Sequence, residues 1–131
     1  MQVSIFLKRV LILDALSCLG MGAGLAIGSG VLGSLFGLSD KLVLSAGLAL
    51  IPVGLFILWA GTRRQIAPLF LYAIIVGNTV WVVESVVVAS DAPDITMMGA
   101  AFVLAQAAAV ATLALLETVG VLRSRNVQAV A

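Results

Sequence analysis

Four long apolar stretches, separated by short polar links, dominate the pattern of hydrophobic and polar positions along the chain. Each approaches or exceeds the roughly 20 residues that an α-helix needs to cross about 30 Å of hydrocarbon. They run approximately over residues 10–36, 42–60, 66–89 and 95–122. Because short links make consecutive spans antiparallel neighbours, the pattern predicts an all-α fold. We expect a single domain over residues 1–131, a transmembrane up-down-up-down four-helix bundle.

The composition supports burial in lipid. The chain is 63% hydrophobic and 10% charged, with a mean hydropathy of +1.25, against about 25% charged residues in an ordinary soluble domain. So few charges would leave large apolar patches exposed to water. The net charge is +1 and basic residues cluster at most in pairs. This argues against a nucleic-acid partner, which would need several cations against its phosphates.

The residue inventory excludes several kinds of site within one chain. There is one cysteine, Cys18, and no histidine, which rules out a disulfide framework, a Cys/His zinc site, a histidine-ligated haem and a Ser-His-Asp triad. Lys8 and Lys41 lie outside the apolar stretches, which disfavours a buried Schiff-base lysine. We therefore expect no catalytic, cofactor-binding or metal site, and a protein that is not an enzyme.

The first stretch also has features of a signal peptide, because Lys8 and Arg9 precede an apolar run with small residues. A typical signal core has roughly 7 to 15 apolar residues. This stretch is longer and contains Asp14. We therefore expect it to be retained as a membrane helix.

The basic residues predict the orientation. All of them except Lys41 fall on one side of the threaded chain: Lys8, Arg9, Arg63, Arg64, Arg123 and Arg125. By the positive-inside rule both termini and the middle link lie in the cytoplasm.

Small residues predict how the first span packs. Gly20, Gly24 and Gly28 recur every four residues, a spacing that lets helix backbones approach closely in lipid. We favour packing inside one subunit, with homo-oligomerisation or a glycine-lined path as alternatives.

Two acidic residues, Asp14 and Glu117, lie toward the cytoplasmic ends of their predicted spans. Charged groups within a membrane are costly and mark functional sites by default. Nearby Lys and Arg residues favour a structural ion pair or an interfacial position for both.

The third and fourth spans carry further polar candidates. At about 100° per residue, Asn78 and Ser85 share one stripe, Glu84 shares another with small residues, and Trp81 lies between the stripes. The small-residue face predicts that a neighbouring helix shelters Glu84. Gln106, at a similar depth, is expected to contact Asn78 or Glu84. Structural hydrogen bonding is favoured for this set, over a proton, ion or solute role or contact with a partner.

Several segments, "LKRVLILDALSC", "GLALIPVGLFILWA", "GNTVWVVES" and "GAAFVLAQAAAVATLALLE" followed by "GVLRSR", resemble a group of small four-helix bacterial membrane proteins with no assigned activity. The resemblance covers nearly the whole chain, and Glu84 departs from it because a small residue is expected there. The recurring positions are Asp14, Pro52, Asn78, Trp81, Ser85, Gly99, Phe102 and Gln106.

We therefore expect a multi-pass protein of the bacterial inner membrane. The favoured function is a non-enzymatic accessory or structural subunit, which packs on itself as a homo-oligomer or on a larger membrane complex. The alternative is a small oligomeric transporter or channel with Asn78, Glu84 and Gln106 along a polar path.

Overall fold

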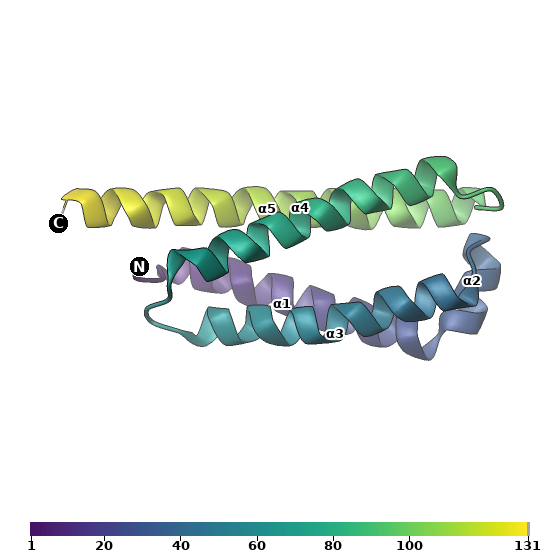
Figure 1. The fold of residues 1–131 in the computed structure, drawn as a ribbon, viewed down its shortest axis with the longest axis horizontal. Helices are drawn as coiled ribbons and strands as arrows, with labels where there is room; N and C mark the ends of the chain where they lie inside the picture. The colour runs from purple at the N-terminus through teal and green to yellow at the C-terminus, as the bar shows by residue number, and fades with distance from the viewer. Residues whose placement is uncertain (131) are drawn as a thin grey trace.

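The fold is all-α. The computed structural model describes residues 1–130, which form the helices α1 (Ile5–Ile27), α2 (Ser29–Phe36), α3 (Asp40–Thr62), α4 (Pro68–Asp91) and α5 (Met97–Val130). Every helix except the short α2 is long and apolar enough to cross a membrane. The four long helices run antiparallel in a bundle (Figure 1). The predicted all-α bundle is thus confirmed, and the chain is a multi-pass membrane protein.

Side-chain caps explain where two of the long helices begin. The Ser4 hydroxyl accepts a hydrogen bond from the backbone N–H of Leu7, and the Ser39 hydroxyl accepts one from Leu42. Such caps satisfy N–H groups that have no partner in the first turn of a helix. The Ser4 cap starts α1 five residues before the predicted boundary at residue 10. This shift moves Asp14 to the middle of its helix.

The predicted first span, residues 10–36, is two helices with a break at Gly28. Gly28 has φ −97° and ψ 17°, outside the α-helical values. The second piece, α2, ends at Gly37, whose φ of +69° is a left-handed conformation that favours glycine. The reversal at Gly37 leads directly into the cap of α3.

The link between α4 and α5 holds the end of α2. The Thr96 backbone N–H donates to Phe36 O at 2.9 Å, and the Thr96 hydroxyl donates to Leu35 O at 2.7 Å. The Phe36 and Phe102 rings stack with centroids 4.7 Å apart. These contacts, which we call the α2 clasp, join the two halves of the chain at one end of the bundle.

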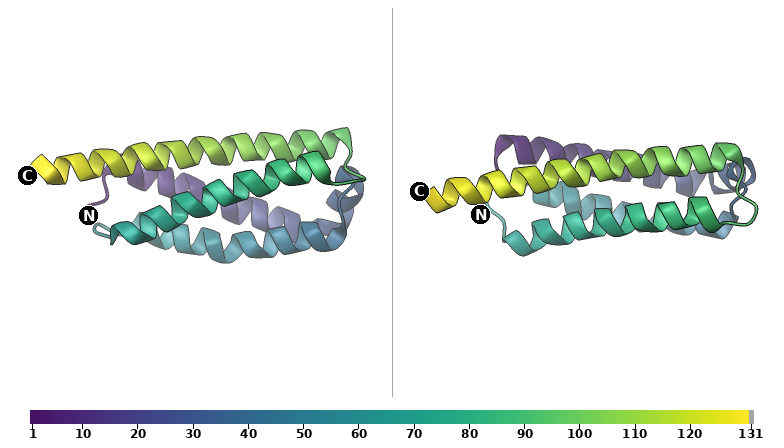
Figure 2. Two further views of the ribbon diagram at one scale, coloured as in Figure 1. Left: turned by 45° about the horizontal axis from the view of Figure 1, so that its top comes forward. Right: turned by 90° about the horizontal axis from the view of Figure 1, so that it is seen from above.

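The long helices form two pairs. Helix α1 packs along α3, and α4 packs along α5, while α1 also contacts α5 and joins the pairs. Helices α3 and α4 barely touch, although they are consecutive in the chain. Figure 2 shows this arrangement in two further views. The seam between α3 and α4 is therefore the least packed side of the bundle.

The glycines that bring helices together are not the predicted ones. A Cβ atom on Gly20 or Gly24 would have nothing within 4 Å, and one on Gly28 would meet only its own helical segment and Leu32. The prediction that these three form a packing face inside the subunit is wrong. Gly22 of α1 and Gly47 of α3 make the close approach instead. The four-residue spacing of small residues therefore identified the right helix, α1, but not the face of it that packs on α3.

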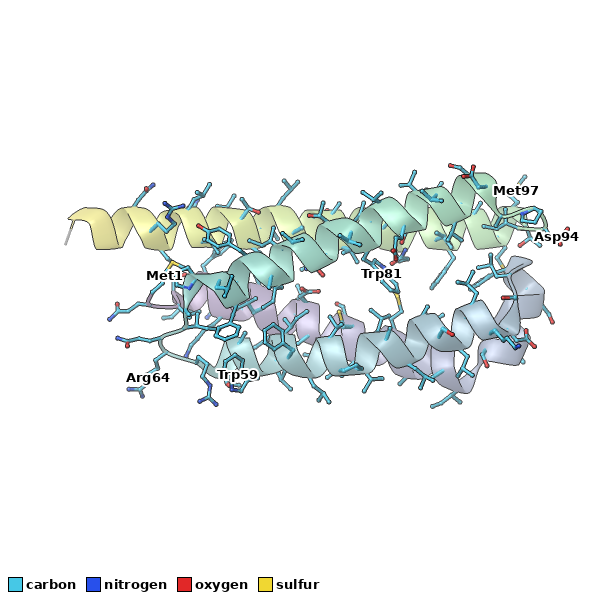
Figure 3. The ribbon with its side chains drawn as sticks, viewed as in Figure 1. Met1, Trp59, Arg64, Trp81, Asp94 and Met97 are labelled. Atoms are coloured by element: carbon cyan, nitrogen blue, oxygen red, sulfur yellow. The ribbon has the colours of Figure 1, made fainter. Side chains whose placement is uncertain are left out.

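The N-terminal segment is tied to the link between α3 and α4. Gln2 and Gln65 form an isolated antiparallel bridge, and the backbone N–H of Val3 donates to Arg64 O at 2.9 Å. Figure 3 shows Met1 and Arg64 at one end of the molecule, with Asp94 and Met97 at the other. The paired basic residues share the first end, which we call the basic end: Lys8, Arg9, Arg63, Arg64, Arg123 and Arg125.

Candidate functional site

Two carboxyl groups and one amide meet in the interior of the bundle. Asn78 Nδ2 donates to Asp14 Oδ2 at 2.7 Å and to Glu117 Oε2 at 3.1 Å. Asp14 and Glu117 are each 1% exposed, and Asn78 is 5% exposed. The three residues come from α1, α4 and α5. We call this group the carboxyl–amide cluster.

The cluster lies deep in the span. Asp14 is nine residues from the start of α1, Asn78 ten from the start of α4, and Glu117 nine before Asn126. At 1.5 Å per residue, each lies about 14 Å from the same end of the bundle. The predicted ion pair or interfacial position is wrong for both acids, because neither has a Lys or Arg partner among the described residues. The true partner is neutral Asn78.

The cluster is rich in carboxyl oxygens and poor in hydrogen-bond donors. Asn78 divides its two amide hydrogens between the acids, and the Cys18 thiol lies 3.7 Å from Asp14 Oδ1 as a further donor. Glu117 Oε1 is buried and has no hydrogen-bond partner within the described chain. A buried carboxylate without a full set of donors or a counter-charge is costly. The arrangement therefore favours a bound cation or proton.

A second polar network lies farther along α4. Trp81 Nε1 donates to Gln106 Oε1 at 2.8 Å, and Gln106 Nε2 donates to Ser85 Oγ at 2.9 Å. The Ser85 hydroxyl donates to Trp81 O at 2.7 Å, which closes the network. The prediction that Gln106 contacts Asn78 or Glu84 is therefore wrong, because its side-chain partners are Trp81 and Ser85. Because its polar atoms are satisfied internally, this network links α4 to α5 structurally.

Glu84 is not sheltered as predicted. Its side chain is exposed, as are Ala73 and Gly77, the small residues that share its helix face at about 100° per residue. A Cβ atom on Gly77 would have nothing within 4 Å. Within one chain, therefore, no helix packs on this small-residue face near Gly77. Glu84 does border a cavity of about 130 Å³, which Ser85 and Gln106 also line.

A larger cavity, of about 410 Å³, opens at the seam between α3 and α4. We call it the seam chamber. Its inner wall includes the buried residues Asp14, Cys18 and Asn78, and its rim includes the exposed Val53 and Gly77. Ligand pockets typically measure about 300 to 1,000 Å³ and combine an apolar lining with a few polar groups. Asp14 and Asn78 of the carboxyl–amide cluster supply such polar groups.

Aromatic residues contribute to the chamber as well. Phe56 lines it from α3, and Trp81 lines it from α4. Trp81 and Met21 also line the smaller cavity, so these two side chains lie between the two spaces. Figure 3 labels Trp81 near the middle of the bundle.

The sequence contains one indication of the cluster that the spacing of residues along a helix does not reveal. The four predicted spans contain several acids but no cation in their central parts. Two acids buried at one depth must then share a neutral donor, and Asn78 lies at the matching depth. Cys18 and Phe56 carry no such signal, because an apolar stretch gives them no distinguishing pattern.

In the described part of the chain, no group of three or more His, Cys, Asp or Glu side chains is arranged to hold a metal ion. Comparison with known proteins found no matching family model, curated protein or solved structure.

Proposed function

We propose that this protein is a small, non-enzymatic membrane carrier that binds a lipophilic cation in the seam chamber. One observation carries the proposal. The buried carboxyl–amide cluster has no cationic partner among the described residues, and two of its members, Asp14 and Asn78, form part of the wall of a cavity that opens at the bundle surface. This is the transport alternative from the sequence, with Asp14 and Glu117 in place of Glu84 and Gln106.

The lining of the chamber supports the chemical class of the solute. Asp14 is the acidic residue in its wall, and it offers a counter-charge where the dielectric constant is low. Phe56 and Trp81 present aromatic rings, which attract cations as well as apolar groups. The remaining surface is aliphatic for the most part. A solute with an apolar body and one positive charge matches this combination.

The cluster also supports exchange of the solute for a proton. Two ionised carboxylates that share one amide would repel each other in a low-dielectric interior. A proton on the pair removes that repulsion when the chamber is empty, and a bound cation compensates the charge when it is full. In this proposal Asp14 meets the solute, and Glu117 lies behind Asn78 as the second proton site.

Binding of tetraphenylphosphonium to the purified protein tests the proposal. The wild type should bind this lipophilic cation and release protons into a weakly buffered detergent solution. Asp14→Asn keeps the shape of the side chain but removes its charge, so binding and proton release should both be lost. Glu84→Gln removes an acid outside the cluster and should leave both intact. Equal binding by folded Asp14→Asn and wild type would refute the proposal.

The accessory or structural subunit remains the second candidate. The uncovered small residues of α1 and α4, including Gly20, Gly24 and Gly77, support it, because their faces are free to meet another protein. Gentle-detergent isolation followed by mass determination distinguishes the candidates. Recovery with a larger partner would favour the subunit. Recovery only as a monodisperse single chain would count strongly against it.

We place the protein in the bacterial inner membrane with both termini in the cytoplasm. The clustering of Lys and Arg at the basic end supports this orientation through the positive-inside rule. A reporter fused to the C-terminus should be active on the cytoplasmic side. Activity only on the opposite side would reverse the orientation.

A further inference from the structure

The basic end holds a second concave surface, separate from the seam chamber. A depression of about 480 Å³ is lined by residues of the N-terminal segment, the first turn of α1 and the link between α3 and α4: Gln2, Val3, Ile5, Lys8, Arg64 and Gln65. The bridge between Gln2 and Gln65 fixes the two segments relative to each other. Lys8 and Arg64, 56 positions apart in the sequence, therefore line one surface on a defined backbone framework.

Among the described residues, no acidic side chain lies beside the positive charge around this depression. The six acidic residues lie elsewhere, with Asp14 and Glu117 in the interior and Glu84 farther along α4. The other three, Asp40, Asp91 and Asp94, belong to the opposite end. Within the described residues no carboxylate neutralises Lys8 or Arg64. The depression thus offers two cations and two glutamine amides to an external anion.

Several neighbouring arginines already have partners. The Arg63 guanidinium lies 5.5 Å from the Trp59 ring centroid, and the Arg123 guanidinium lies 5.5 Å from that of Phe6. Arg125 donates to the Tyr72 hydroxyl at 2.9 Å. No such contact is found for Lys8 or Arg64 in the described chain.

An apolar track leads from the depression along α1. Ile5 is 71% exposed at the edge of the depression, and Ile12 and Leu16 are 37% and 57% exposed farther along the helix. Spacings of seven and four residues place all three within about 20° of one face of the helix. An acyl chain lying on this track would carry a phosphate group at the level of Lys8 and Arg64.

We infer that this depression binds the phosphate headgroup of an anionic membrane phospholipid, with an acyl chain along Ile5, Ile12 and Leu16. Guanidinium and ammonium groups bind phosphate through charge-assisted hydrogen bonds. The apolar track favours a lipid over a free phosphate ion, which would use only the polar part. The inference is independent of solute binding in the seam chamber.

The test is native mass spectrometry of the full-length protein in detergent, titrated with phosphatidylglycerol or phosphatidylcholine. Phosphatidylglycerol should bind more tightly than phosphatidylcholine. The double variant Lys8→Gln with Arg64→Gln should bind it about 25-fold more weakly, at about fivefold for each cation near the membrane surface. Lys41→Gln, which removes the cation at the opposite end, should bind like the wild type.

Two further arms separate lipid binding from misfolding of the variant and from binding of free phosphate. The charge-conserving double variant Lys8→Arg with Arg64→Lys should retain most of the affinity, which shows that a loss in the glutamine variant reflects charge. Inorganic phosphate at millimolar concentration should not displace the lipid. Unchanged phosphatidylglycerol affinity in the glutamine variant, an equal loss in Lys41→Gln, or full displacement by phosphate would overturn the inference.

Discussion

Replacement of Gly47 by alanine would test the packing of α1 on α3. A Cβ atom at this position would lie 2.6 Å from the Ala26 backbone nitrogen and 2.7 Å from the Gly22 carbonyl oxygen. Both neighbours are backbone atoms, so neither can rotate away. Relief of the closer contact to an ordinary distance of about 3.4 Å would require the helices to separate by about 0.8 Å. A gap of about 0.5 to 1 Å loses a quarter to a half of the dispersion energy of the contacts that it opens.

This loss should be large for a membrane protein. Dispersion and close packing drive helix association in lipid, where the hydrophobic effect between helices is weak. Overpacking by one methyl group typically costs about 1 to 3 kcal/mol. We expect Gly47→Ala to lower the free energy of unfolding by that amount, measured by reversible unfolding in mixed micelles with increasing dodecyl sulfate.

Gly20→Ala is the matched control on the neighbouring helix. A Cβ atom there would meet nothing within 4 Å, and alanine favours a helix over glycine by about 1 kcal/mol in water. The control should be as stable as the wild type or slightly more stable. If Gly47→Ala unfolds at the wild-type midpoint, or if Gly20→Ala loses as much stability, the proposed register of α1 and α3 is wrong.

Three further variants test other parts of the structure in the same unfolding assay. Asn78→Leu should lower the free energy of unfolding by about 3 kcal/mol because both buried acids lose their shared donor. Its control, Thr79→Val at an exposed position, should stay within about 0.5 kcal/mol of the wild type. Gln106→Leu should lower the free energy of unfolding by about 1 to 3 kcal/mol because the partly buried Trp81 N–H loses its acceptor; wild-type stability would contradict the second network. Gly37→Ala should cost at least about 1 kcal/mol because its left-handed backbone disfavours a Cβ atom, and an unchanged midpoint would argue against this turn.

The sequence predicted the long helices well because hydropathy and length are local properties. It missed the break at Gly28 because this residue was interpreted as a helix-packing position, although Gly28, Ser29 and Gly30 together form a short helix-breaking signal. The start of α1 was also misplaced, because the charges of Lys8 and Arg9 set the predicted boundary after them. The Ser4 cap shows that they belong to the first turns of the helix.

The candidate site was predicted only in part. Asn78, Trp81, Ser85 and Gln106 were recognised as polar residues in an apolar setting, but their partners depend on how each helix is rotated. That rotation follows from close contacts such as the one between α1 and α3, which a single helix pattern does not encode. Glu84 was predicted as a candidate because of its charge, although it lies outside the carboxyl–amide cluster.

The carboxyl–amide cluster has a consequence for biosynthesis. Asp14 is made first, 64 residues before Asn78 and 103 before Glu117. An acid at the centre of a membrane helix costs about 2.5 to 3.5 kcal/mol on insertion scales. During synthesis α1 must therefore either wait at the translocation channel or enter the bilayer with its acid unpaired. The nascent chain can complete this cluster only after its last helix has been made, and a product truncated before α4 would retain Asp14 without its Asn78 donor, a defect that membrane quality control could recognise.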